Sequence, residues 1–265
     1  MIDLTIQKIV IMTLLCVLAG FIDSIAGGGG LVSLTSYYAI GLPPIYALGN
    51  NKFSSTFGTF FAMLNYARKK EVIWRVALSG AVFSILGALI GAQLALRFVG
   101  TIFRYMLLIV LPILTFFTLF KPKHKEKERH TITIKSEGDG IKFSIGIKGY
   151  ITIAFVSLII GIYDGFFGPG TGMFYTLILS SIGFPMIYAC GITKAINLAS
   201  NIAAVTTFIV NGNIIYKLGI PCMIASIVGN LLGSEFAIKK DTKVIKPMLL
   251  LVIVALYIKI IVGLF

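Results

Sequence analysis

The sequence predicts an all-α polytopic membrane protein made of two inverted-topology repeats. Three observations predict it: a very apolar composition, basic segments between apolar ones, and an internal repeat along the whole chain. Of the 265 residues, 57% are hydrophobic and only 12% are charged, whereas a soluble domain carries roughly 25% charged residues. At about 20 residues per span, the chain holds about 8–10 transmembrane or re-entrant helices, several broken by Gly or Pro.

Two glycine-rich motifs mark the repeat. GFIDSIAGGGG (residues 20–30) matches GIYDGFFGPGTG (residues 161–172) at an offset of 141 residues, and the offset is 142 from there on. IGLPPIYALGNNK then matches IGFPMIYACGITK, and SILGALIGAQLA matches SIVGNLLGSEFA. We therefore predict a first transmembrane repeat over residues 1–120, a hydrophilic linker over 121–148 and a second repeat over 149–265.

Each half contains the same series of segments. An apolar segment leads into the glycine motif, a short apolar segment follows, and a proline turn precedes a lysine-bearing helix and two further spans. The expected ranges are 5–26, 31–42, 47–66, 76–96 and 104–120 in the first half, and 150–167, 172–184, 189–210, 219–238 and 248–265 in the second. The short segment cannot cross ~30 Å of hydrocarbon at ~1.5 Å per residue. It is either part of a broken span or one arm of a re-entrant hairpin.

Basic loops set the expected orientation. Segments 67–75, 121–148 and 239–247 carry net charges of +3, +4 and +3, which places them in the cytoplasm by the positive-inside rule. Segment 211–217 holds only Lys217 and is expected outside, yet it corresponds to the cytoplasmic 67–75. The halves are therefore expected to have opposite orientations, with both termini outside and the 121–148 linker, which has room for a small hairpin, in the cytoplasm. This distribution accounts for the net charge of +13 without nucleic acid.

Inverted repeats are typical of secondary transporters, whose sites lie where the halves meet. Lys52 and Lys194 occupy equivalent positions after the proline turns. Because a charge inside an apolar segment is costly, we expect the two ammonium groups to converge on an anion. The alternative is that each lysine reaches the interface or pairs with Asp23 or Asp164. Polar residues that could complete an anion site are Asn51, Thr193, Asn197 and Asn201.

The glycine motifs are the second candidate for binding an anion, because glycine lets backbone N–H groups approach a ligand closely. The residues concerned are Gly28, Gly29, Gly30, Gly170 and Thr171. The alternative is close packing of helix backbones. Asp23 and Asp164 precede these loops and are expected to be structural charges, or else proton-coupling groups. Glu235, which faces Gln93 in the repeat alignment, is a candidate proton relay, and Lys259 is expected to extend to the membrane surface.

The paired motifs GFIDSIAGGGG with ALGNNK and GFFGPGTG with GITK resemble those of the sulfite exporter TauE/SafE family. The resemblance covers nearly the whole chain, at Asp23, residues 27–30, Asn51, Lys52, Asp164, Gly168, Gly170 and Lys194. It implies a multi-pass protein of the plasma membrane that moves sulfite, sulfonates or related organic anions. Only the resemblance points to sulfur; the repeat and the lysines predict an anion carrier.

Three functions compete at this point. A secondary anion transporter, expected to be an exporter, works by alternating access and draws on an H⁺ or Na⁺ gradient. A passive channel would use the same lysines to line a pore. An intramembrane enzyme would need a nucleophile–base or metal constellation, which the sequence lacks: Cys16, Cys190 and Cys222 are far apart, and both histidines lie in the linker. We therefore expect no enzymatic activity, metal or cofactor. The expected partners are a small anion and the lipid bilayer.

Overall fold

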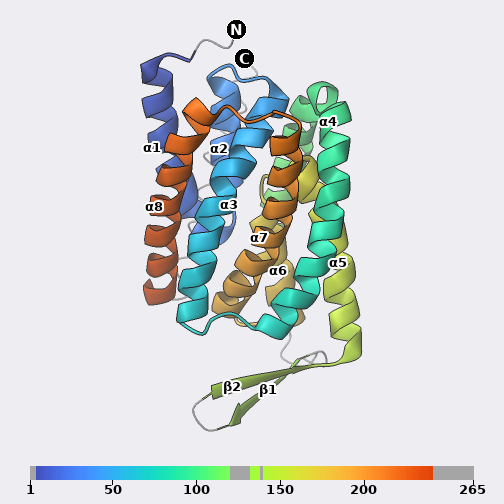
Figure 1. Ribbon diagram of the computed structural model, residues 1–265. Helices are drawn as coiled ribbons and strands as arrows, with labels where there is room; N and C mark the ends of the chain where they lie inside the picture. The colour runs from blue at the N-terminus through green and yellow to red at the C-terminus, as the bar shows by residue number, and fades with distance from the viewer. Residues whose placement is uncertain (1–3, 120–131, 138–139, 241–265) are drawn as a thin grey trace.

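The computed structural model describes residues 4–119, 132–137 and 140–240, and apart from one hairpin these residues are mostly helical (Figure 1). The helices are α1 (Ile6–Ala26), α2 (Gly29–Ala39), α3 (Pro44–Arg68), α4 (Trp74–Leu119), α5 (Ile147–Phe166), α6 (Thr171–Ile182), α7 (Met186–Val210) and α8 (Tyr216–Lys240). The strands β1 (Ile132–Glu137) and β2 (Gly140–Ile145) pair antiparallel, which confirms a small hairpin in the linker.

Five helices of the described chain are long and apolar enough to cross a membrane: α1, the Trp74–Phe98 part of α4, α5, α7 and α8. This confirms the all-α polytopic architecture. Helix α3 has 25 residues, like α7, but is more polar because it carries Asn65 and Arg68 in addition to the one lysine and two asparagines that both helices contain.

The two short helices are return arms of hairpins. Helix α1 ends at Gly27, and the 11-residue α2 leads back to the end of the molecule at which α1 began, where α3 starts (Figure 1). In the second half α5, the 12-residue α6 and α7 follow the same path from the opposite end. Of the two alternatives for the short segments, the structure favours the re-entrant arm.

The expected spans at 76–96 and 104–120 both fall within α4, and its Trp74–Phe98 part is long and apolar enough to cross a membrane, which confirms the first of them. The start of α4 and the β1–β2 hairpin lie at the same end of the molecule (Figure 1). The expected span at 248–265, with Lys259, lies outside the described residues.

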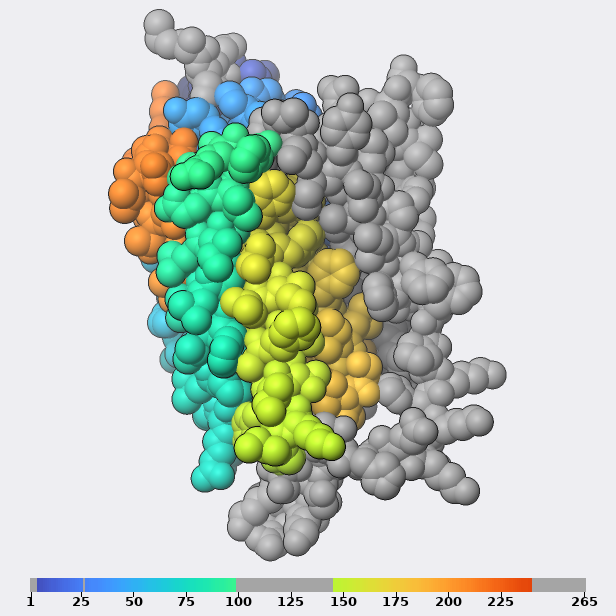
Figure 2. Space-filling model, turned by 90° about the vertical axis from the view of Figure 1, so that its right-hand side faces the viewer, coloured from blue at the N-terminus to red at the C-terminus, as the bar shows by residue number. Residues whose placement is uncertain are grey.

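Corresponding helices of the two halves pack in the same way. Helix α1 lies against α8, and α5 lies against α4 along its length (Figure 2). A Cβ added to Gly229 would lie 2.1 Å from the carbonyl oxygen of Val17, and one on its counterpart Gly87 would lie 2.3 Å from that of Leu158. Small residues thus let the backbones touch, as is common between membrane helices.

The outer faces of these helix pairs are suited to lipid. Large apolar side chains are exposed there at intervals of four residues: Leu78, Val82, Leu86 and Ile90 on α4, and Ile151, Phe155 and Ile159 on α5. Many polar side chains lie inside instead, mostly on the buried faces of α2, α3, α6 and α7, with Asp164 on α5 and Asn230 on α8 among the others. The interior of the bundle therefore holds the candidate site.

Candidate functional site

Two buried ion pairs lie inside the bundle. The ammonium of Lys52 on α3 is 2.7 Å from a carboxylate oxygen of Asp164 on α5, and both side chains are only 2% exposed. Lys52 also donates a hydrogen bond of 2.9 Å to Oδ1 of Asn201 on α7. The charge is therefore held by one ionic and one neutral partner, both from the second half of the chain.

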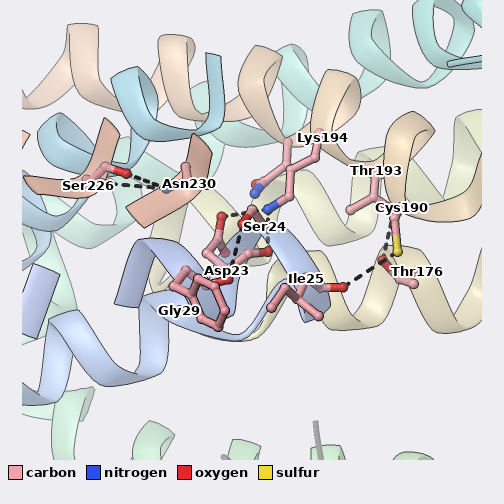
Figure 3. A network of polar contacts seen from close by, with 12 residues as sticks. Asp23, Ser24, Ile25, Gly29, Thr176, Cys190, Thr193, Lys194, Ser226 and Asn230 are labelled. Atoms are coloured by element: carbon pink, nitrogen blue, oxygen red, sulfur yellow. Dashed lines mark hydrogen bonds and ion pairs between the residues drawn. The ribbon is translucent and has the colours of Figure 1, made fainter. Parts of the chain in front are cut away.

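The second ion pair has the reciprocal arrangement. The ammonium of Lys194 on α7 lies 2.6 Å from a carboxylate oxygen of Asp23 near the end of α1 (Figure 3). It also donates to the backbone carbonyl of Asp23, at 2.5 Å. Asp23 is more accessible than Asp164, with 14% of its side chain exposed.

Each lysine thus pairs with the aspartate of the other half. Asp23 and Asp164 are counterparts in the repeat, and so are Lys52 and Lys194. The alternative in which the lysines pair with these aspartates is confirmed. An isolated charge buried in this way would cost several kcal/mol, so the pairs explain how four ionisable residues are accommodated in the bundle.

The two glycine loops meet between these pairs. Gly27 ends α1 with a positive φ of 75°, and Gly170 precedes α6 with a φ of 82°. A Cβ added to Gly27 would lie 2.2 Å from the carbonyl carbon of Gly172. The alternative of close backbone packing therefore holds at Gly27 and Gly172, which leave no room for a side chain.

A central cavity lies where the loops and ion pairs meet. It is lined by Asp23, Lys52, Asp164, Asn51, Ser55, Thr59, Asn197, Asn201 and glycines of both loops. Its volume is about 20 Å³, which is enough for roughly one water molecule. Two oxygens facing this region, Oγ1 of Thr59 and Oδ1 of Asn197, are buried without a hydrogen-bond partner in the described part of the chain. The cavity is therefore polar, and some of its polar atoms have no hydrogen-bond partner among the described residues.

The structure brings most of the candidate residues together. Asn51, Lys52, Gly30, Gly170, Thr171, Asn197 and Asn201 line the central cavity together with both aspartates. Five candidates are not in that lining, and one of them is Lys194, whose ammonium is paired with Asp23. Thr193 accepts a hydrogen bond from Thr176, Gly28 packs against Met173, and Gly29 lines a second cavity. Glu235 lines neither cavity.

Glu235 lies at the protein surface. It pairs at 3.1 Å with Lys239 one turn further along α8 and accepts a hydrogen bond from Asn65. This setting is that of an ordinary helix-surface ion pair.

Sequence reasoning missed Thr59 as a lining residue. Thr59 could have been found, because Lys52, Ser55 and Thr59 are the repeat counterparts of the predicted stripe Lys194, Asn197 and Asn201. Both triplets have the i, i+3, i+7 spacing that places side chains on one face of a helix.

The chemistry of the site is that of charge recognition. The charges of two ammonium groups and two carboxylate groups cancel, and amide, hydroxyl and backbone groups surround them. Within residues 4–119 and 140–240, no group of three His, Cys, Asp or Glu side chains could hold a metal ion. The groups present can bind and release ions, and none is arranged as a nucleophile beside a base.

Known proteins agree with this description. The model of the family "Sulfite exporter TauE/SafE" matches residues 12–260. A probable membrane transporter protein, ORF9, of a Sinorhizobium species is 33% identical over 97% of this chain and 94% of its own. A probable membrane transporter protein of Haemophilus influenzae is 32% identical over 94% of this chain and 92% of its own. The probable membrane transporter protein YfcA of Escherichia coli K12 is 31% identical over 91% of this chain and 85% of its own.

No solved structure matches the chain. The family match and the relatives cover nearly the whole chain, and the relatives carry the names of transporters, not of enzymes. The chain therefore belongs to the sulfite exporter TauE/SafE family and is a multi-pass membrane transporter, not an enzyme.

Proposed function

We propose that this protein is a secondary transporter that moves small anions, sulfite, sulfonates or related organic anions, by alternating access between two inverted repeats. The observation that carries the proposal is the exchange of ion-pair partners between the halves, Lys52 with Asp164 and Lys194 with Asp23, around one cavity. A site held jointly by two halves changes whenever the halves move relative to each other.

The directions of the helices support the inverted arrangement. Helix α3 begins at the end of the molecule where the chain starts, whereas its counterpart α7 begins at the opposite end (Figure 1). Lys52 and Lys194 each lie eight residues into their helices, about 12 Å along the axis. One ion pair therefore lies toward each end of the bundle. Opening one pair would admit an anion from one side while the other pair stays closed.

An anion would bind by replacing a carboxylate. In this conformation both lysines are engaged by aspartates, and the central cavity, which Lys52 and both aspartates line, has room for about one water molecule. A sulfite or sulfonate oxygen would take the place of the carboxylate oxygen on the ammonium. Charge-assisted hydrogen bonds are roughly twice as strong as neutral ones, which offsets part of the cost of removing the anion from water.

The net charge of the site supports coupling to a cation. The charges of two lysines and two aspartates sum to zero, so binding an anion alone would give the buried site a net negative charge. Cotransport of H⁺ or Na⁺ keeps the site neutral, and Asp23 and Asp164 are the groups to receive it. The basic loops favour outside termini and a cytoplasmic linker at 121–148.

The experiment is counterflow of labelled sulfite in proteoliposomes loaded with unlabelled sulfite. We expect saturable accumulation of label, competed by sulfonates more strongly than by unrelated anions, because a carrier exchanges one bound anion for another. The passive channel is the second candidate. A channel would give flux that follows the voltage and does not saturate, with no counterflow. That result would contradict the carrier and favour the channel.

A further inference from the structure

A second, smaller cavity adjoins the central one. It has a volume of about 10 Å³ and is lined by Asp23, Ser33, Ser54, Ser55, Ser226 and Asn230, together with Cys16 and small residues. Asp23 and Ser55 line both cavities. Figure 3 shows Asn230 and Ser226 of α8 beside the Asp23–Lys194 pair. A space of this size holds one water-sized particle.

The polar groups of this second cavity present oxygen lone pairs to it. Asn230 donates from Nδ2 to the backbone carbonyl of Ser226 at 2.9 Å. A carbonyl can only accept, so this bond fixes the orientation of the amide. Oδ1 of Asn230 is then left buried without a partner among the described residues.

Two serine hydroxyls of the same cavity are used in a similar way. The shortest hydrogen bond of the Ser33 hydroxyl is donated to Oδ1 of Asn51, at 2.5 Å, and Ser54 donates to the backbone carbonyl of Asn50 at 3.0 Å. Both protons are directed at other oxygens of the chain, so the hydroxyl oxygens keep lone pairs. With the Asp23 carboxylate, these oxygens form a set suited to a hard cation, which prefers oxygen ligands. The thiol of Cys16 is a soft group and does not belong to that set.

The other half of the chain fills the equivalent space with a side chain. The counterpart of Ser33 is Tyr175, whose hydroxyl lies 3.1 Å from Oγ of Ser84, the counterpart of Ser226. The counterpart of Asn230 is Ala88. Tyr175 is 1% exposed and also donates to the carbonyl of Ser157. The oxygen-lined cavity is therefore specific to Asp23 and is not a general product of the repeat.

We propose that the second cavity is a Na⁺ site formed by Asp23, Ser33, Ser54, Ser226 and Asn230. The proposal rests on the proposed function and deepens it by naming the coupling ion. Sodium bound to Asp23 would replace the ammonium of Lys194 there and free that ammonium for the anion in the adjoining central cavity. One cation and one anion then enter together, and the site stays neutral. A water molecule would satisfy the same oxygens without supplying this charge.

Thermal unfolding of the purified full-length protein in detergent tests the site without any transported anion. At constant ionic strength, we expect NaCl to raise Tm saturably, and KCl or choline chloride not to, because a ligand that binds only the folded state stabilises it. Asn230→Ala, which installs the residue that the other half carries, should raise the Na⁺ concentration of half-maximal effect at least tenfold. Ser226→Ala should act in the same direction, and its counterpart Ser84→Ala should leave that concentration unchanged.

Two outcomes would overturn the Na⁺ site. One is a wild-type Tm that responds equally to Na⁺, K⁺ and choline. The other is an unchanged Na⁺ response in both Asn230→Ala and Ser226→Ala. Sulfite counterflow measured in sodium-free buffer separates this proposal from the proposed function. Counterflow without any sodium response would remove the Na⁺ site and leave the anion transporter, coupled to protons, in place.

Discussion

Lys52→Ala is expected to destabilise the protein by about 3–5 kcal/mol, because it leaves the carboxylate of Asp164 buried without its ionic partner. The ammonium and the carboxylate are 2.7 Å apart and both side chains are 2% exposed, so the carboxylate would be left without the solvation that bulk water gives an exposed charge. Chemical or thermal unfolding in detergent measures the loss. The double variant Lys52→Ala/Asp164→Ala removes both charges and should recover most of it.

The exposed pair Lys239–Glu235 provides the matched control. Its nitrogen–oxygen distance of 3.1 Å is also that of an ion pair, but the two side chains are 69% and 37% exposed. Surface pairs contribute little to stability, so Lys239→Ala should unfold like the wild type. A double variant at Lys52 and Asp164 that is no more stable than Lys52→Ala would show that the destabilisation does not come from the unpaired charge.

Gly27→Ala is expected to cost about 2–6 kcal/mol and to prevent the two glycine loops from meeting. The residue has a φ of 75°, which costs a residue with a side chain about 1–3 kcal/mol. The added Cβ would also lie 2.2 Å from the carbonyl carbon of Gly172, which is backbone and cannot rotate away. Overpacking of this kind costs about 1–3 kcal/mol more. The measurement is the unfolding midpoint together with the yield of monodisperse protein.

Substitutions at two other glycines separate the conformational cost of a positive φ from the steric cost of the added Cβ. Gly41 has a φ of 91° with nothing within 4 Å of an added Cβ, so Gly41→Ala carries only the conformational cost. Gly146 has open space as well and no positive φ, so Gly146→Ala should be nearly neutral. If Gly27→Ala is no worse than Gly41→Ala, the loops do not meet as closely as described.

Much of the fold could be predicted from the sequence because the physical constraints on it are strong. Apolar segments separated by basic loops define membrane helices, and a charge inside an apolar segment is rare enough to mark Lys52, Lys194, Asp23 and Asp164 as candidates. The pairing between halves was one of two alternatives, since sequence alone does not show which face of α3 or α7 meets α5 or α1.

The second cavity could not be predicted because it results from small differences between matching positions. Ser33 aligns with Tyr175, and Asn230 aligns with Ala88. The alignment does not show that Ser33 and Asn230 leave a cavity whereas the Tyr175 side chain fills the equivalent space. That depends on packing between α1, α2, α3 and α8. The contact of Gly27 with Gly172 is hidden for the same reason, since it joins loops of opposite halves.

Counterflow of labelled sulfite by the folded Lys52→Ala/Asp164→Ala variant tests the central claim most directly. The variant keeps the site neutral and removes the charges that link the halves at one end of the cavity. If the exchange of partners around one cavity is the transport mechanism, wild-type protein shows saturable counterflow and the variant, with a matching unfolding midpoint, shows none. Counterflow by the variant at the wild-type rate would contradict the account, because the anion would then cross without Lys52.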